Sequence, residues 1–404
     1  MRWPETQLRY LSQVPITNGL GEAGDKGNPI DWPRYIRTTD INDLLTLHED
    51  RRVTLPIAKA EAALVKKDDI LMTAAGATVG KSFQYCQAEP ACYAGYLVRW
   101  RPDTKFAFPR FMAYWTDSKH FYDQIATGTV KSTIENFSAS KYRSMRAPMP
   151  SLDEQETIAD YLDRETQKID ELIAEQRGLI ETLRERRQAG IDAEFEKLPE
   201  LRIKLRRYIK FLTSGSRGWG DYYAGSGDTF VRIGNLPRSG LELGGERKFV
   251  ALPPEVHEGQ RTILETGDLL FSITAYIGSV AVVNGDWEGG YVSQHVALCR
   301  LDRAVLNAKF VGYFALSDEG RHQLSEGAVG GTKVQLALDD IKSLRVPHVP
   351  LDLQGRIVTY LDEQLSRIDE LISESEDLIA LSQERRAALI TAAVTGQIDV
   401  GEAS

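Results

Sequence analysis

Hydrophobic residues recur at steps of three, four or seven positions in two long segments of the chain. Neither segment contains proline: the first runs from residue 152 to 198 and the second from 351 to 404. Such spacing places apolar side chains on one face of an α-helix and is typical of helices that pack along one another. The pattern predicts two long helices, with apolar positions at Ile158, Leu162, Ile169, Leu172, Leu179 and Leu183 in the first and at Ile357, Leu361, Ile368, Leu371 and Leu378 in the second.

The start of the first helix carries a clear signal. Ser151 and Glu154 follow Pro150 and form a capping box, in which each side chain accepts a hydrogen bond from the other residue's backbone N–H. The second helix lacks this pair, and Asp352 is expected to cap it instead.

The two helical segments are copies of each other. LDEQETIADYLD begins at Leu152 and LDLQGRIVTYLD at Leu351, an offset of 199, and about half of some forty aligned positions are identical. The segments that precede them share fainter landmarks, which predict one frame used twice, a pseudo-twofold internal repeat. These landmarks are Asp69-Ile70-Leu71 with Asp268-Leu269-Leu270, Phe111 and Tyr114 with Phe310 and Tyr313, and Arg146 and Pro148 with Arg345 and Pro347.

The repeat predicts an α+β protein with two globular domains and two long helices that pair as an antiparallel coiled coil. Short β-rich runs lie among glycine-rich turns, at 70–73, 96–100, 269–274 and 296–301. We place the first globular domain at 1–150, the central helix at 151–199, the second globular domain at 200–349 and the C-terminal helix at 350–404. A forty-residue helix is roughly 60 Å long, so this pairing would hold a globular domain at each end.

Charge is divided unevenly between these parts. The formal net charge is −9, but residues 1–151 carry 20 basic and 16 acidic groups, and residues 201–348 carry 18 and 16. The helical segments hold the acidity, with 7 basic against 15 acidic groups in 152–200 and 4 against 11 in 349–404. Two mildly basic globular domains on an acidic frame are compatible with nucleic-acid binding, although many solvated surfaces show the same balance.

Cysteine usage and the apolar segments predict a cytoplasmic protein that does not cross a membrane. The three cysteines show no Cys-x-x-Cys spacing, which fits a reducing compartment. The N-terminus has no apolar core of a secretory signal. The longest apolar stretch, at 269–283, is too short to span a bilayer and is rich in β-forming residues.

Motifs for catalysis are weak in this sequence. AGATVGKS, from Ala75 to Ser82, resembles a phosphate-binding loop, but its first glycine is replaced and the repeated copy keeps Gly278 with Ser279 in place of Lys81. A structural turn explains both copies better than nucleotide binding. The six histidines include no close pair at metal-ligand spacing, so no metal site is expected.

Recognition chemistry is better represented. TGTVKSTIENF at 127–137 and VGGTKVQLALD at 329–339 occupy similar places late in each globular domain, where a lysine and small polar residues can reach phosphates and base edges. A second related pair comes from YIR at 35–37 and FVR at 230–232. For each candidate an ordinary surface loop or a buried hydrogen bond is the alternative. The candidate DNA contacts are Arg37, Lys81, Lys131, Ser132, Thr133, Arg232, Gln294, His295, Thr332, Lys333 and Gln335.

The order of variable globular domain, repeated helix, variable globular domain and repeated helix resembles the specificity subunit of type I restriction–modification systems. The similarity is strongest in LDEQETIADYLD followed by KIDELI, and in QERRAALITAAVTGQIDV at 383–400. The first copy departs from that ending after Ile191, which fits a helix that leads into a second domain.

The resemblance implies a non-catalytic DNA-binding subunit. Each globular target-recognition domain would read one half of a bipartite site in double-stranded DNA, and the helices would set the spacing between the halves. Two methyltransferase subunits would dock on the chain, with restriction (motor) subunits as further partners. S-adenosylmethionine, ATP and magnesium are expected on those partners, and no cofactor is expected in this chain. The alternative is a coiled-coil scaffold whose two domains bind protein or carbohydrate.

Overall fold

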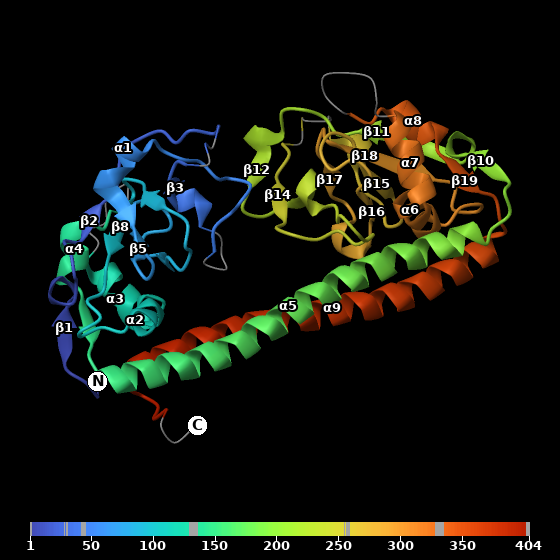
Figure 1. Cartoon of the computed structure of the whole chain (residues 1–404). Coiled ribbons are helices and arrows are strands. Elements are labelled where there is room, and N and C mark those ends of the chain that lie inside the picture. The colour runs from blue at the N-terminus through green and yellow to red at the C-terminus, as the bar shows by residue number, and fades with distance from the viewer. Residues whose placement is uncertain are drawn as a thin grey trace. The chain divides into compact units, whose positions relative to one another are not determined.

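The computed structural model shows an α+β chain that folds into two compact units. It describes residues 2–27, 29, 31–41, 46–128, 136–253, 255, 259–327 and 335–400. Unit 1 consists of residues 1–177 and 376–404, and unit 2 of residues 178–375. The two predicted long helices are present as α5 (Leu152–Glu196) and α9 (Leu351–Val394), and each contributes a part to both units (Figure 1).

The globular part of unit 1 is built on a four-stranded antiparallel sheet of order β2-β8-β5-β6. A second sheet has three strands in the order β3-β7-β4 and includes a parallel pair, β3 with β7, while β1 pairs with β9. The elements are β1 (Glu5–Gln7), β2 (Thr17–Asn18), β3 (Arg34–Ile36), α1 (Ile57–Ala60), β4 (Leu64–Val65), β5 (Ile70–Thr73), β6 (Ser82–Gln84), β7 (Ala91–Tyr93), β8 (Leu97–Trp100), α2 (Pro109–Thr116), α3 (Lys119–Gly128), α4 (Ala139–Ser144) and β9 (Arg146–Pro148).

Unit 2 repeats this plan. Its sheets have the orders β11-β18-β15-β16 and β12-β14-β13-β17, the pair β13 and β17 is parallel, and β10 pairs with β19. The elements are β10 (Arg202–Lys204), β11 (Ile209–Ser214), β12 (Tyr223–Ala224), β13 (Asp228–Val231), β14 (Lys248–Val250), β15 (Leu269–Ser272), β16 (Val280–Val282), β17 (Tyr291–Val292), β18 (Val296–Leu301), α6 (Ala308–Leu316), α7 (Asp318–Gly327), α8 (Leu338–Ser343) and β19 (Arg345–Pro347).

The core of each unit joins the central sheet to the long helices. In unit 1 the buried faces of β5 and β8 pack with α2 and with both long helices, through Met72, Trp100, Trp115, Leu162 and Ile390 among others. In unit 2 the corresponding cluster includes Phe271, Cys299, Phe314, Phe195 and Leu361. Most of the predicted apolar positions therefore pack against the partner helix or a globular domain. The prediction is wrong at Leu179, Leu371 and Leu378, which are 44%, 47% and 37% exposed.

The predicted capping box at the start of α5 is confirmed. The Ser151 backbone N–H donates to Glu154 Oε2 at 2.9 Å, and the Glu154 N–H donates to Ser151 Oγ at 3.3 Å. The expectation that Asp352 caps α9 is wrong. The helix begins at Leu351, so Asp352 lies inside its first turn, where its carboxylate pairs with Arg356 one turn on at 3.4 Å.

A buried glutamine near the start of each long helix binds backbone groups of the neighbouring globular part. Gln155 Oε1 accepts from the Phe108 N–H at 2.7 Å, and its Nε2 donates to the carbonyls of Phe106 and Pro150 at 3.0 Å each. In unit 2 the equivalent residue, Gln354, makes the same three contacts. It accepts from Asn307 N–H at 2.9 Å and donates to the carbonyls of Val305 at 3.0 Å and Val349 at 2.9 Å.

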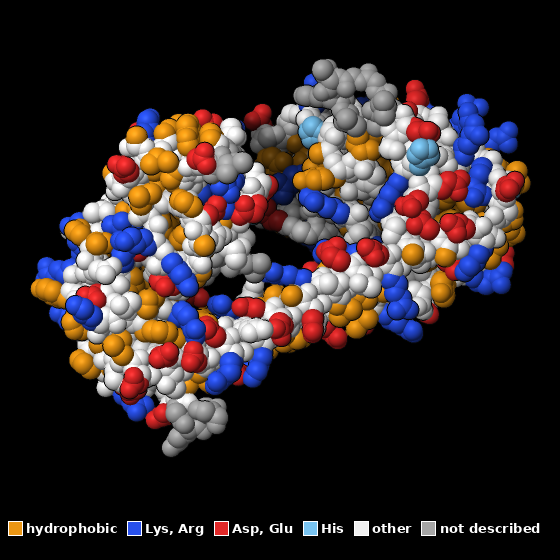
Figure 2. Space-filling view, viewed as in Figure 1, with side chains coloured by type: hydrophobic (Ala, Val, Ile, Leu, Met, Phe, Trp, Pro, Cys, Tyr) orange, Lys and Arg blue, Asp and Glu red, His pale blue; other side chains and the backbone are white. Residues whose placement is uncertain are grey.

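Ion pairs between α5 and α9 show that the helices run antiparallel within each unit. In unit 1, Arg386 of late α9 pairs with Asp170 of early α5, and in unit 2, Arg187 of late α5 pairs with Asp369 of early α9. Each Nε–Oδ1 distance is 3.0 Å. The two pairs are equivalent under the offset of 199, so the predicted antiparallel pairing and the internal repeat are both confirmed. Side chains of Asp and Glu recur along the visible face of these helices (Figure 2).

The AGATVGKS segment is a hairpin turn. It connects β5 to β6, which pair antiparallel, and the corresponding turn in unit 2 connects β15 to β16. Gly76 and Gly80 have φ values of 92° and 89°, in the left-handed region that favours glycine. A phosphate-binding loop leads instead from a strand into a helix, so this geometry rules out that reading of the motif.

Candidate functional site

Arg37 and Arg232 occupy equivalent places in the two units. Each follows a strand of the parallel pair, β3 or β13, and precedes a short 3-10 helix, η2 (Thr38–Asp40) or η6 (Ile233–Asn235). The backbone N–H of each arginine donates to a side chain three residues later, at 2.9 Å to Asp40 Oδ2 and 2.9 Å to Asn235 Oδ1. The backbone around the arginine is therefore the same in both units, and the side chain opposite it differs.

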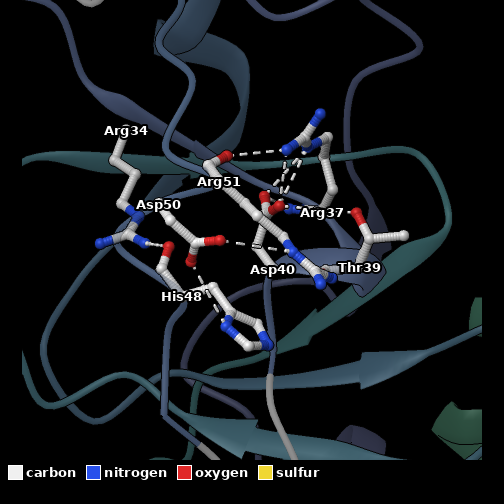
Figure 3. A network of polar contacts seen from close by, with 7 residues as sticks. All are labelled: Arg34, Arg37, Thr39, Asp40, His48, Asp50 and Arg51. Carbon is white, nitrogen blue, oxygen red and sulfur yellow. Dashed lines mark hydrogen bonds and ion pairs between the residues drawn. The ribbon is translucent and has the colours of Figure 1, made fainter. Parts of the chain in front are cut away.

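In unit 1 that group is a carboxylate, which holds the arginine in place. Arg37 Nη2 donates to Asp40 Oδ1 at 2.6 Å and Nε donates to Asp40 Oδ2 at 3.0 Å, while Nη2 also reaches the carbonyl of Arg51 at 2.8 Å (Figure 3). Asp40 is buried, and its hydrogen bonds raise the pKa of Arg37 above its ordinary value. Arg51 in turn donates to the carbonyl of Thr39 at 3.1 Å. These contacts restrict Arg37 to one conformation.

In unit 2 the carboxylate is absent from this position. Asn235 uses its amide N–H groups to hold the carbonyls of Gly244 at 2.8 Å and Glu246 at 3.1 Å. The Arg232 guanidinium lies 3.6 Å from the exposed carboxylate of Glu246, and its buried Nε has no hydrogen-bond partner among the described residues. Arg232 therefore retains hydrogen-bonding capacity that Arg37 has already used.

The loop after the neighbouring strand also differs between the units. In unit 1 it reads Ala94-Gly95-Tyr96 between β7 and β8, and in unit 2 it reads Ser293-Gln294-His295 between β17 and β18. The backbone is equivalent, because Ala74 N–H donates to Tyr96 O at 2.8 Å and Ile273 N–H donates to His295 O at 3.1 Å. The loop of unit 1 presents an exposed tyrosine, whereas that of unit 2 presents an amide and an imidazole.

In unit 2, Arg232 and the loop Ser293-Gln294-His295 line one cavity of about 630 Å³. Trp219, Tyr223 and Phe230 form an aromatic wall, and polar groups face the same space. Trp219 belongs to the 3-10 helix η5 (Trp219–Tyr222), which Gly218 precedes with a left-handed φ of 88°. The remaining lining residues are Ser216, Arg217, Gly218, Gly220, Arg232, Ile233, Gly234, Asn235, Glu246, Ser293, Gln294 and His295.

Three buried polar atoms at this cavity have no hydrogen-bond partner among the described residues. They are Trp219 Nε1, Arg232 Nε and Ser293 Oγ. Trp219 and Ser293 are 7% and 8% exposed. His295, by contrast, is held by Thr274 Oγ1 at 3.1 Å and by Gln294 Nε2 at 2.9 Å.

The structure brings together three of the predicted candidates, Arg232, Gln294 and His295. Lys81 follows the β5–β6 turn, with Nζ 3.4 Å from the carbonyl of Ile41, and Gln335 is exposed just before α8. Arg37 lies in the other unit, engaged with Asp40. The candidates Lys131, Ser132, Thr133, Thr332 and Lys333 lie outside the described residues.

Sequence reasoning missed Trp219 and Ser293. Ser293 directly precedes the two candidates of its loop. Trp219 stands between two glycines in SRGWG, a composition that favours an exposed turn and gave no sign that the indole is buried. In the part of the chain that the structure describes, no group of three or more His, Cys, Asp or Glu side chains could hold a metal ion. No described helix is long and apolar enough to cross a membrane.

Comparisons with known proteins agree on one family. The model of the type I restriction modification DNA specificity domain matches residues 16–182 and 254–380. Two similar proteins are the StySPI specificity subunit of Salmonella potsdam and the EcoKI specificity subunit of Escherichia coli K12. Each is a type I restriction enzyme subunit with 23% identity, over 84% of this chain and 76% of the relative.

Solved structures share the fold. A chain from a study of complex assembly and conformational transition of the type I R-M system has a TM-score of 0.75 at 16% identity, with 97% of both chains covered. The HsdS subunit of Thermoanaerobacter tengcongensis has a TM-score of 0.51 at 16% identity, with 98% of this chain and 97% of that chain covered.

Proposed function

The chain belongs to the family of type I restriction–modification DNA specificity subunits, and from this premise we propose that each of its two units reads one half of a split sequence in double-stranded DNA. As a specificity subunit it is not itself an enzyme. The chemistry of modification and cleavage belongs to other subunits, and this chain determines where on the DNA it occurs.

One observation carries the proposal: the same frame presents different side chains at equivalent positions in the two units. Unit 1 has Asp40 where unit 2 has Asn235, and it has Gly95-Tyr96 where unit 2 has Gln294-His295. Base edges are distinguished by the donors and acceptors offered to them, so two units with different polar groups favour two different half-sites. The recognised sequence should therefore be asymmetric rather than palindromic.

In unit 2 we assign base contacts to Arg232, Gln294 and His295. Arginine and glutamine can each form two hydrogen bonds to one base, which is the geometry that specifies a base pair. Lys131, Ser132, Thr133, Thr332, Lys333 and Gln335 remain proposed contacts to phosphates and base edges, as do Arg37 and Lys81.

The long helices are proposed to carry the partner subunits and to set the spacing of the half-sites. The known relatives belong to type I restriction enzymes, and a similar chain was solved in a study of complex assembly. Leu179 and Leu378 are equivalent under the internal repeat and are 44% and 37% exposed, and the nearby Leu371 and Leu381 are also exposed. Repeated apolar side chains on two helices suit two copies of one partner, which we propose to be methyltransferase subunits that bind S-adenosylmethionine. Restriction subunits with ATP and magnesium would complete the complex.

The test is co-expression with the cognate methyltransferase subunit, followed by sequencing of methylated adenines. We expect one bipartite motif that depends on this chain. Replacement of residues 1–150 by those of a relative should change one half of the motif and leave the other unchanged. Insertion of equal helical segments into both α5 and α9 should change only the spacer.

A salt titration separates this function from the scaffold alternative. Binding of the complex to a duplex should weaken steeply between 50 and 200 mM salt, because cationic side chains displace counterions from the phosphates. Absence of DNA binding with the methyltransferase present, together with methylation that lacks any bipartite motif, would refute the proposal.

A further inference from the structure

We propose that the cavity of unit 2 binds one unstacked nucleobase, with a preference for guanine. When that base comes from bound DNA, the inference rests on the proposed function; when it comes from a free nucleotide, it stands alone. The cavity is lined by Trp219, Tyr223, Phe230, Arg232, Glu246 and Ser293.

The aromatic wall suits a flat ring. The rings of Trp219 and Phe230 lie 4.8 Å apart between centroids at an interplanar angle of 35°, and Tyr223 meets Phe230 edge-on at 5.8 Å. Nucleobases stack on Trp, Tyr and Phe whatever their sequence. Tyr223 is 49% exposed, whereas Trp219 and Phe230 are 7% and 2% exposed, so Tyr223 offers the open ring and the other two support it. The volume of about 630 Å³ lies in the range of small-ligand sites and exceeds the size of a single base.

The polar groups at the wall call for a ligand with acceptors. Trp219 Nε1–H and Arg232 Nε–H are donors without partners among the described residues, and the Ser293 hydroxyl can donate or accept. Buried donors are normally satisfied, so three such atoms on residues of one cavity are unusual. Because solvent does not reach them in this structure, a ligand contacts them only when the side chains of the wall shift. The Arg232 side chain is 36% exposed, so its terminal amino groups are the open donors. Guanine offers two acceptors, O6 and N7, side by side.

The carboxylate of Glu246 supports guanine over the other bases. It lines the same cavity and accepts from Lys248 at 2.5 Å, which leaves further lone pairs for a ligand. Guanine carries N–H donors at N1 and N2, whereas adenine has no donor at either position. A site that holds both cationic donors and a carboxylate therefore matches both edges of guanine.

The base must be unstacked to use this cavity. In a duplex the faces of a base are covered by its neighbours, and only its edge is open in a groove. An aromatic wall contacts a ring face, which is accessible in a free nucleotide or in a base rotated out of the helix. Arg217, which also lines the cavity, supplies a second positive charge for the attached phosphate.

The first arm of the test uses free nucleotides and the full-length chain. GMP, AMP, CMP and TMP are titrated separately, and binding is followed by calorimetry and by tryptophan fluorescence. We expect GMP to bind with a Kd of about 1 mM and the others at least fivefold more weakly. Trp219→Phe keeps the ring but removes the N–H, and Arg232→Gln removes the cation; each should weaken GMP binding at least fivefold.

Arg238→Gln is the matched control. Arg238 is an arginine of the same unit that lies over the Tyr276 ring at 4.0 Å, and neither residue lines the cavity. Its replacement should leave GMP binding unchanged. Thermal unfolding of all three variants reports whether a loss of binding reflects a loss of fold.

The second arm uses the complex with methyltransferase on duplex DNA that contains its methylation motif. A fluorescent guanine analogue, 6-methylisoxanthopterin, replaces each guanine of the half-site read by unit 2, one at a time. We expect at least a twofold change in emission at one position, lost in Trp219→Phe and Arg232→Gln. DNA affinity is measured independently by electrophoretic mobility shift.

The outcomes are separable. Specific DNA binding with no emission change at any position, together with no GMP binding, overturns the inference and leaves the proposed function intact. GMP binding without an emission change supports the cavity and identifies a free nucleotide as its ligand. Absence of both DNA and nucleotide binding overturns both the inference and the proposed function.

Discussion

Replacing Gln354 with alanine should destabilise the protein far more than any replacement on the exposed face of the same helix. Gln354 is 1% exposed and holds three backbone groups of unit 2, the N–H of Asn307 and the carbonyls of Val305 and Val349, at 2.9–3.0 Å. Alanine cannot replace any of these hydrogen bonds, and the partners remain in a buried site.

The expected loss follows from these three contacts. A hydrogen bond contributes about 1 kcal/mol to stability, and a buried group left without a partner costs about 1–3 kcal/mol. The three losses together give a decrease of about 3–5 kcal/mol in the free energy of unfolding. For a domain of roughly 200 residues, 1 kcal/mol shifts Tm by about 2–4 °C, so Tm should fall by at least ~6 °C.

Differential scanning calorimetry and urea denaturation of the full-length chain would measure this change. Gln383→Ala is the matched control, because Gln383 is an exposed glutamine of the same helix. Its effect should remain within about 0.5 kcal/mol. Gln155→Ala, the equivalent replacement in unit 1, should cost about as much as Gln354→Ala. Equal unfolding temperatures of Gln354→Ala and Gln383→Ala would show that the three hydrogen bonds of Gln354 do not stabilise the fold.

Three further predictions follow from single contacts. Hydrogen bonds from the backbone N–H and the hydroxyl of Ser151 lower the pKa of Glu154 from its ordinary 4.5, so its carboxylate stabilises the fold above about pH 4.5 and less as pH falls through the lowered pKa. In urea unfolding, Glu154→Gln should therefore be less stable than the unaltered protein at pH 7, and the difference should shrink as the pH is lowered below 4.5. The Arg187 side chain is 8% exposed, so Arg187→Ala should lower the free energy of unfolding by about 1.5–3 kcal/mol, measured by thermal unfolding. Asp369→Ala should be destabilising too, because it leaves the buried Arg187 cation without its partner. Asp40→Asn removes the charge that holds Arg37, and fluorescence anisotropy should then show a steeper salt dependence of DNA binding, because a mobile arginine can reach a phosphate.

The two long helices and the repeated order of elements could be predicted from the sequence, because short segments specify them and each segment occurs twice. The helix periodicity, the capping box at Ser151 and the shared landmarks each appear in a short window, and the copy confirms them. The strands at 70–73 and 296–301 were predicted with their observed bounds. The wrong cap at Asp352 has a simple cause, since aspartate is favoured both at the N-cap and within the first turn of a helix.

The cavity could not be predicted, because its residues come from three separate parts of unit 2. Trp219 belongs to η5, Arg232 follows β13, and Ser293 follows β17. The pairing of β13 with β17 and the left-handed turn at Gly218 help to bring them together. Neither the parallel register nor the burial of an indole in a glycine-rich turn is visible in a local pattern of residues.

The contacts of Gln155 and Gln354 explain how the proposed DNA-binding residues can differ between two units of the same fold. Gln155 and Gln354 bind backbone N–H and carbonyl groups, which remain when the side chains of those residues are replaced. The ion pairs of Arg187 with Asp369 and of Arg386 with Asp170 join one long helix to the other. The residues that differ, such as Asn235 in place of Asp40, lie in short 3-10 helices and loops that neither glutamine contacts. Substitutions in those segments therefore change the groups offered to DNA but have little effect on the packing of each unit against α5 and α9. A subunit that determines the recognised sequence requires this property.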